Sequence, residues 1–263
     1  MAKQTLDKAQ QRAAALVENK HVHNTRKTIE YAISSGSLSL DVMLGGIRPG
    51  ITRLVGMSMG GKTSEAFQIM QSAFKSRPRC RGIYVKTEKL VKNMKERIGV
   101  KVTTDFNEWN NHTCFIVETI VYELVAQFVK DLVYDNAELP EAEQEQFVFI
   151  IDSVDFLILE SDLKKEAGDA HKVAGPQVLT KKLLREVTAE LHKYGHIAIF
   201  ISQVTAQPNI NAYSAPEPRV AGAVGGGNSL IHAADNILEF KHRNKADYIL
   251  EDPNAKPDPI KNK

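Results

Sequence analysis

A glycine-rich turn between an apolar segment and a helix-permissive run constrains this chain more than any other feature. The stretch LVGMSMGGKTSEA, residues 54–66, contains Gly56, four further residues, and then Gly61-Lys62-Thr63. This spacing is the G-x-x-x-x-G-K-[ST] pattern of a phosphate-binding P-loop. With average residue usage the pattern arises by chance in roughly one per cent of chains of this length. We therefore interpret it as a nucleotide site, against the alternative of a ligand-free strand-to-helix turn.

The chemistry of phosphate binding explains each position of this loop. Successive glycines let backbone N–H groups turn inward and form a nest for phosphate oxygens, and the helix that begins near Lys62 points its positive end at the same anion. Lys62, expected on a solvent-facing loop, adds a charge at the β- and γ-phosphates of ATP, and the Thr63 hydroxyl is expected to ligate Mg²⁺. The predicted nucleotide-binding residues of the loop are Gly56, Met57, Ser58, Met59, Gly60, Gly61, Lys62, Thr63 and Ser64.

The composition bounds the class of protein. A chain of 263 residues with 43% hydrophobic and 25% charged residues is typical of a soluble globular protein with one large domain. The net charge of +2 is too small to indicate nucleic-acid binding by itself, so any basic surface must be local. The two cysteines fit neither a disulfide framework nor a zinc site. The absence of a signal-peptide core or a long apolar run predicts a cytoplasmic protein without a membrane partner.

Strand and helix patterns alternate through most of the sequence. This alternation predicts an α/β fold with a mostly parallel, doubly wound sheet. We divide the chain into an N-terminal helical arm and linker (1–30), an ATPase core (31–243) and a C-terminal segment (244–263). The expected strands lie at about 51–56, 82–87, 113–118, 147–152 and 196–202, with helices at about 62–76, 89–98, 119–135 and 177–194.

Three polar residues at or just after the ends of predicted strands complete the nucleotide site. Asp152 ends the apolar run FVFIID in the manner of a Walker B aspartate, which holds Mg²⁺ through water. Because parallel strands place their carboxyl ends at one edge, Asp152 and the P-loop are expected to converge, although a strand-terminal aspartate can also cap a turn. Glu88 follows the strand GIYVKT and could activate the water that attacks the γ-phosphate. Gln203 ends IAIFISQ, where its amide could hydrogen-bond that phosphate.

A long segment without convincing helix or strand patterns follows Gln203. It covers residues 204–224, and a segment of this length within a compact domain is usually functional or disordered. The sequence GGGNSLIHAADNILEF comes next and predicts a glycine hinge, a short helix and another strand.

With these motifs in order, the chain resembles the bacterial RecA-type recombinases from about residue 28 to residue 243. ISSGSLSLDVMLGG is similar to the segment that precedes the family's P-loop, and YVKTEKLVKNMKERIGV to its catalytic-glutamate segment, which implies that Glu88 is the activating carboxylate. VFIIDSVDFLILESDLKKEAGDAHKVAGPQ resembles the Walker B strand and the first DNA-binding loop, L1. IFISQ implies that Gln203 is the nucleotide-sensing glutamine, and the run after it resembles the second DNA-binding loop, L2.

The resemblance implies a homo-oligomeric helical filament on single-stranded and double-stranded DNA, with ATP and Mg²⁺ as cofactors and pairing of homologous strands. The DNA-binding residues that it nominates are Lys164, Lys165, Lys172, Tyr213, Arg219, Gly226, Gly227 and Asn228. L1 carries nearly balanced charges and L2 only one cation, so a solvated loop is the alternative for L1. Small residues and Tyr213 in L2 suit backbone contacts to phosphates and a wedge between bases.

The sequence also departs from the family's pattern. Lys92 and Lys95 stand where the family has its adenine-contacting aspartate and stacking tyrosine, so recognition of the base must differ. The family's DAE reads KTE here, and we expect a short form without the family's C-terminal domain. The final IKNK resembles a segment whose lysines reach a neighbour's ATP, which nominates Lys261 and Lys263 as further nucleotide contacts.

The leading hypothesis is therefore a DNA-dependent ATPase and recombinase. One alternative is a scaffolding assembly that binds ATP to set subunit contacts and hydrolyses it poorly, and another is a related hexameric DNA motor.

Overall fold

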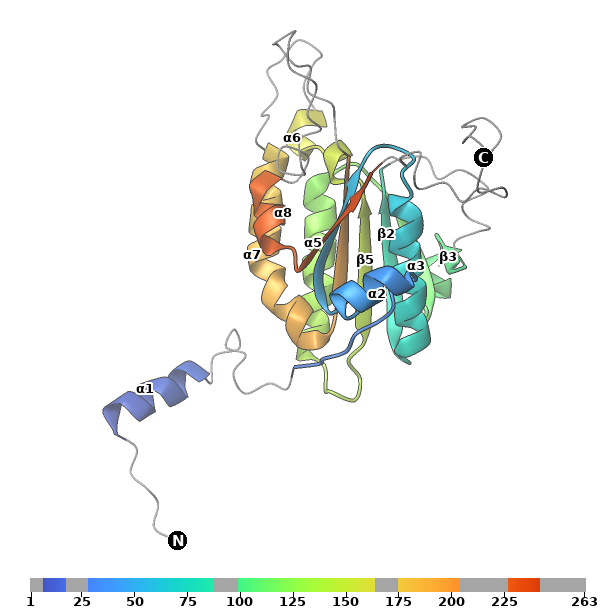
Figure 1. Cartoon of the computed structure of the whole chain (residues 1–263). Coiled ribbons are helices and arrows are strands. Elements are labelled where there is room, and N and C mark those ends of the chain that lie inside the picture. The colour runs from blue at the N-terminus through green and yellow to red at the C-terminus, as the bar shows by residue number, and fades with distance from the viewer. Residues whose placement is uncertain (1–6, 18–27, 88–98, 164–174, 204–226, 242–263) are drawn as a thin grey trace, which may run out of the picture.

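A single parallel sheet of seven strands organises the chain. The computed structural model describes residues 7–17, 28–87, 99–163, 175–203 and 227–241 (Figure 1). The strand order is β3-β4-β2-β5-β6-β1-β7, and every neighbouring pair is parallel, which confirms the predicted α/β class with a doubly wound sheet. The strands are β1 Gly50–Gly56, β2 Cys80–Lys86, β3 Lys101–Thr103, β4 Thr113–Glu118, β5 Gln146–Asp152, β6 Ile197–Gln203 and β7 Asn236–Phe240.

Helices cover both faces of this sheet. Figure 1 shows α3 on one side and α5, α7 and α8 on the other. The helices are α1 Lys8–Val17, α2 Leu38–Leu44, α3 Lys62–Ser76, α5 Tyr122–Glu138, α6 Glu160–Leu163, α7 Gly175–Tyr194 and α8 Gly227–Ala233, with 3₁₀ turns η1 Phe106–Glu108 and η2 Val154–Phe156. Helix α1 buries none of its residues. No helix in the described ranges is long and apolar enough to cross a membrane.

Two hydrophobic clusters, one on each face, hold the layers together. Phe67 and Met70 of α3 pack with Leu54 of β1 in the first cluster, and Val129 of α5 and Leu184 of α7 belong to the second. The central strands β1, β5 and β6 are buried along almost their whole length. Strands covered on both faces read as continuous apolar runs, which is why FVFII and IAIFI could be predicted from the sequence.

The structure corrects the predicted start of one helix and adds two short elements. Helix α5 begins at Tyr122 rather than at 119, because residues 120 and 121 pair with Ile158: Ile158 N–H donates to Ile120 O at 2.8 Å, and Tyr122 N–H donates to Ile158 O at 2.9 Å. Strand β3 and helix α2 were not predicted; both are short, and a three-residue edge strand gives almost no periodic signal. The predicted helix at 89–98 lies outside the described residues.

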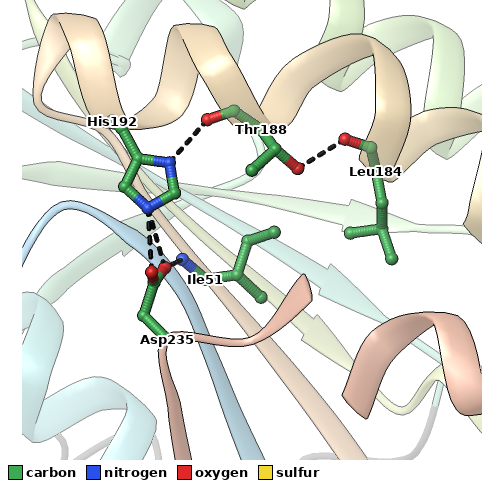
Figure 2. A network of polar contacts seen from close by, with 5 residues as sticks. All are labelled: Ile51, Leu184, Thr188, His192 and Asp235. Carbon is green, nitrogen blue, oxygen red and sulfur yellow. Dashed lines mark hydrogen bonds and ion pairs between the residues drawn. The ribbon is translucent and has the colours of Figure 1, made fainter. Parts of the chain in front are cut away.

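A polar clamp joins α7 to the start of β1 and β7 at the amino end of these strands (Figure 2). Asp235 Oδ2 accepts the Ile51 N–H at 2.7 Å, while Asp235 N–H donates to Ile51 O at 2.8 Å. His192 Nε2 lies 2.9 and 3.0 Å from the two carboxylate oxygens, and its Nδ1 lies 2.7 Å from Thr188 O. A carbonyl oxygen only accepts, so Nδ1 carries the proton of that contact. The clamp fixes where β7 begins beside β1.

Candidate nucleotide site

The P-loop connects the carboxyl end of β1 to the first turn of α3. Gly56, the last residue of β1, has φ 155°, and a Cβ built there would meet the backbone oxygen of Phe240 in β7 at 2.3 Å. Only glycine fits this close approach. Gly61 is the N-cap of α3 with φ 98°, which also favours glycine, and Met59 at the tip of the loop is fully exposed. The glycines required by the pattern therefore stand where the backbone needs them.

Lys62 is buried, which contradicts the expectation of a solvent-facing loop position. It is the first residue of α3 and is 6% exposed. Its ammonium group donates to Gly56 O at 3.0 Å and to Met57 O at 2.8 Å, so the side chain folds back across the loop that it follows. The position matters for chemistry because a desolvated ammonium interacts more strongly with phosphate than an exposed one does.

Thr63 and Asp152 meet at the same edge of the sheet, although 89 positions separate them in the sequence. The Thr63 hydroxyl donates to Asp152 Oδ2 at 2.7 Å, and Asp152 is 5% exposed. Mg²⁺ prefers hard oxygen ligands and usually binds through one or two carboxylates together with substrate phosphates. A hydroxyl and a carboxylate at this distance beside a phosphate nest fit ATP with Mg²⁺. The hydroxyl of Thr63 and the carboxylate of Asp152 are therefore the candidate magnesium ligands. In the described part of the chain no three His, Cys, Asp or Glu side chains gather as metal ligands.

Two neighbours of Asp152 were not predicted from the sequence. Tyr84, which is 1% exposed in β2, donates its hydroxyl to Asp152 Oδ2 at 3.2 Å. Thr87 donates from Oγ1 to Asp152 O at 2.9 Å and accepts the Ser153 N–H at 2.8 Å. These contacts fix the carboxylate and the backbone on which it stands. The sequence signal was that both residues fall within the four positions before Glu88.

Gln203 lies next to the P-loop. It ends β6 and is the register partner of Gly56, while its backbone N–H donates to Asp155 Oδ2 at 2.6 Å. Asp155 belongs to η2, which follows Asp152 in the chain. The backbone of Gln203 is therefore held between the P-loop strand and the start of the predicted L1, which covers about residues 155–175.

A buried arginine lies beneath this part of the edge. Arg53 of β1 is 0% exposed, and its Nε donates to Ser202 Oγ at 3.3 Å. Desolvation lowers the pKa of Arg53, and the charge of Asp155 acts in the opposite direction. Arg53 therefore links β1 to β6 through its hydrogen bond to Ser202, and it interacts electrostatically with Asp155 of η2. The sequence signal for this residue is an arginine within the otherwise apolar strand ITRLVG.

Ser58, Gly60 and Ser64 lie in the described P-loop segment, from the end of β1 to the first turn of α3. Apart from the P-loop residues, Asp152 and Gln203, the predicted site residues lie wholly or partly outside the described ranges. Gly227 and Asn228 form the first turn of α8. The others lie outside the described residues: Glu88, Lys164, Lys165, Lys172, Tyr213, Arg219, Gly226, Lys261 and Lys263.

Sequence comparisons connect this site to a known group of proteins. No protein-family model matches the chain. It is 30% identical over 198 residues to protein RecA of Wolinella succinogenes, 32% over 201 residues to that of a Sulfurovum species, and 31% over 195 residues to that of Deinococcus radiodurans. The matches cover 72–73% of this chain and 48–50% of the relatives, so the chain spans about half the length of the curated relatives it matches. They show a distant, RecA-like relationship.

Proposed function

From this distant relationship to RecA proteins and the geometry of the carboxyl edge, we propose that the chain is a DNA-dependent ATPase of the RecA type. The observation that carries the proposal is the hydrogen bond of 2.7 Å between Thr63 and Asp152, which brings the P-loop helix and the Walker B strand together. Gln203 is paired in register with Gly56 at the same edge. Three motifs far apart in the sequence thus converge where ligands bind in parallel sheets.

The residues of this edge have different roles in phosphoryl transfer. Lys62, Gly61 and the loop backbone hold the β- and γ-phosphates, and Thr63 and Asp152 hold Mg²⁺. A bound Mg²⁺ would offset the negative charge that develops on the phosphate oxygens during transfer. Glu88, which follows β2, orients and deprotonates the attacking water.

We further propose that the chain assembles as a filament on single-stranded DNA and promotes pairing and exchange of homologous strands. The order and spacing of the L1 and L2 segments relative to Asp152 and Gln203 support this step. Backbone amides and small side chains of L2 contact the DNA phosphates, and the cations of L1 add charge.

ATP hydrolysis measured with increasing single-stranded DNA at two salt concentrations tests the proposal. We expect turnover to rise with DNA and the DNA affinity to fall as salt increases, since phosphate contacts release counterions. Light scattering on the same samples reports the assembly. If the rate of ATP hydrolysis does not change with DNA concentration at either salt concentration, the proposed DNA dependence is contradicted. The proposed nucleotide site is not contradicted by that result.

Gln203 is the proposed link between nucleotide and DNA. Its backbone is fixed by Gly56 and Asp155, so removal of the side chain in Gln203→Ala leaves the strand in place. We expect nearly unchanged nucleotide affinity but loss of most of the difference in DNA affinity between the ATP and ADP states. Fluorescence anisotropy of labelled DNA with a non-hydrolysable ATP analogue and with ADP measures this difference. A variant that still discriminates the two nucleotides fully would leave Gln203 as a structural residue.

A scaffolding assembly with weak hydrolysis is the second candidate. The nearly balanced charges of L1 and the single cation of L2 favour it. It predicts nucleotide-dependent assembly, slow turnover and no response to DNA, which the same titration detects.

A further inference from the structure

A charged row crosses three strands at the carboxyl edge of the sheet, beside the candidate magnesium site. Lys86, the last residue of β2, is the register partner of both Asp152 at the end of β5 and Glu118 at the end of β4. The order along the row is therefore Asp152, Lys86, Glu118. Neighbouring strands lie about 4.8 Å apart, and register partners point to the same face of a sheet.

The contacts of the row identify which face it occupies. The Tyr84 hydroxyl reaches Asp152 Oδ2, so the side chains of Tyr84 and Asp152 share a face. Lys86 follows Tyr84 by two residues and lies on that face too. This is the face that α3 covers, because Tyr84 packs in the cluster formed with α3, and Thr63 reaches Asp152 from the first turn of that helix.

Glu118 holds the ammonium group of Lys86. The distance from Lys86 Nζ to Glu118 Oε1 is 2.6 Å, and the side chains are 16% and 62% exposed, respectively. The ion pair draws the positive charge one strand outward from Asp152. The lysine side chain is nevertheless mostly buried in the register position next to that carboxylate, where its charge is less screened than at the surface.

We propose that Lys86 is a site residue that sets the Mg²⁺ requirement of nucleotide binding, and that Glu118 tunes it. This inference rests on the proposed ATP and Mg²⁺ site. A fixed cation beside Asp152 weakens the attraction of that carboxylate for a divalent cation, because like charges repel. Glu118 offsets part of this effect by neutralising Lys86 and holding it on the outer side of the row.

Four variants separate the charge of Lys86 from its packing. Lys86→Met removes the cation, Lys86→Arg keeps it, Glu118→Gln releases it, and the double variant Lys86→Met with Glu118→Gln removes both charges. Lys75→Met is the matched control, because Lys75 is an exposed lysine in the last turn of α3, at the other end of the helix from Thr63. Thermal unfolding of each variant establishes that it is folded.

The measurement is the Mg²⁺ midpoint for binding of a fluorescent ATP analogue at constant ionic strength, with an EDTA blank. A part-exposed ion pair changes such a midpoint by about three- to fivefold. We expect Lys86→Met to lower the midpoint by about this factor and Glu118→Gln to raise it, while Lys86→Arg and Lys75→Met stay near the wild-type value. The double variant should match Lys86→Met, since Glu118 acts through Lys86.

The outcomes also distinguish this inference from the proposed function. A wild-type protein that binds no nucleotide at any Mg²⁺ concentration overturns the nucleotide site itself. A wild-type protein that binds nucleotide, with Lys86→Met at or above the wild-type midpoint, overturns the role of Lys86 alone. An additive effect of Glu118→Gln in the double variant shows that Glu118 acts independently, which overturns its tuning role.

Discussion

Replacing Glu65 by glutamine is expected to raise the free energy of unfolding more at pH 8 than at pH 5. Glu65 lies in the first turn of α3, two residues after Thr63, and is half-buried. In the described part of the chain its buried Oε1 has no hydrogen-bond partner. Desolvation, and secondly the charge of Asp41, raise the pKa of Glu65 from 4.5 to about 6. Asp41 stays charged because hydrogen bonds from Ser34 and Ser35 lower its pKa.

The direction and the size of this effect on the free energy of unfolding follow from the linkage between protonation of Glu65 and folding. The folded state holds the proton of Glu65 more tightly than the unfolded state does, so stability is lost as the pH rises from 4.5 through 6. A shift of this size corresponds to at most about 2 kcal/mol. Glu65 is partly exposed, so solvent screening reduces the expected loss to about 1 kcal/mol. Glutamine resembles the protonated carboxyl group and avoids the loss.

Urea unfolding of wild type and Glu65→Gln at pH 5 and pH 8 measures this difference. Glu138→Gln is the control, because it removes a charge from an exposed position at the end of α5 and should change both values equally. Equal stabilisation by Glu65→Gln at the two pH values would refute the reasoning, since a pH-independent gain comes from packing rather than from desolvation of a charge.

Three further substitutions test other parts of the structure. Lys62→Ala should abolish tight binding of ATP with Mg²⁺, measured by calorimetry, and should cost about 1 kcal/mol of stability because two hydrogen bonds to the loop are lost. Glu88→Gln should keep nucleotide affinity but slow single-turnover hydrolysis, and turnover within a few-fold of wild type argues against an activating role. Asp235→Ala should lower the free energy of unfolding by about 2 kcal/mol by removing the acceptor for Ile51 N–H and the partner of His192, and Asp235→Asn should cost less. Urea titration measures the free energy of unfolding of both variants. Equal decreases in the two variants would mean that Asp235 stabilises the fold through its charge and not through the hydrogen bond from Ile51 N–H.

The sequence was sufficient for the parts of the fold whose signal is local. The P-loop and the apolar strand before Asp152 each lie within about ten residues, and strands covered on both faces reveal themselves as unbroken apolar runs. Helix α5 began three residues later than predicted because its expected first turn pairs with Ile158, a partner almost 40 positions away. Local propensity carries no information about such a pairing.

The charged row at the carboxyl edge is harder to derive from the sequence, and the reason is register. Asp152, Lys86 and Glu118 are the last residues of their strands, and parallel strands end at a common edge, so the residues can be aligned once the strand ends are known. The sequence pattern predicted a strand over residues 82–87, whereas the corresponding strand β2 ends at Lys86. An error of one residue places Thr87 in the row instead and turns Lys86 to the opposite face of the sheet. Strand boundaries predicted from periodicity carry errors larger than this. The position of the Lys86 charge beside the candidate magnesium site therefore depends on the register between three strands. The sequence of one strand alone does not determine that register.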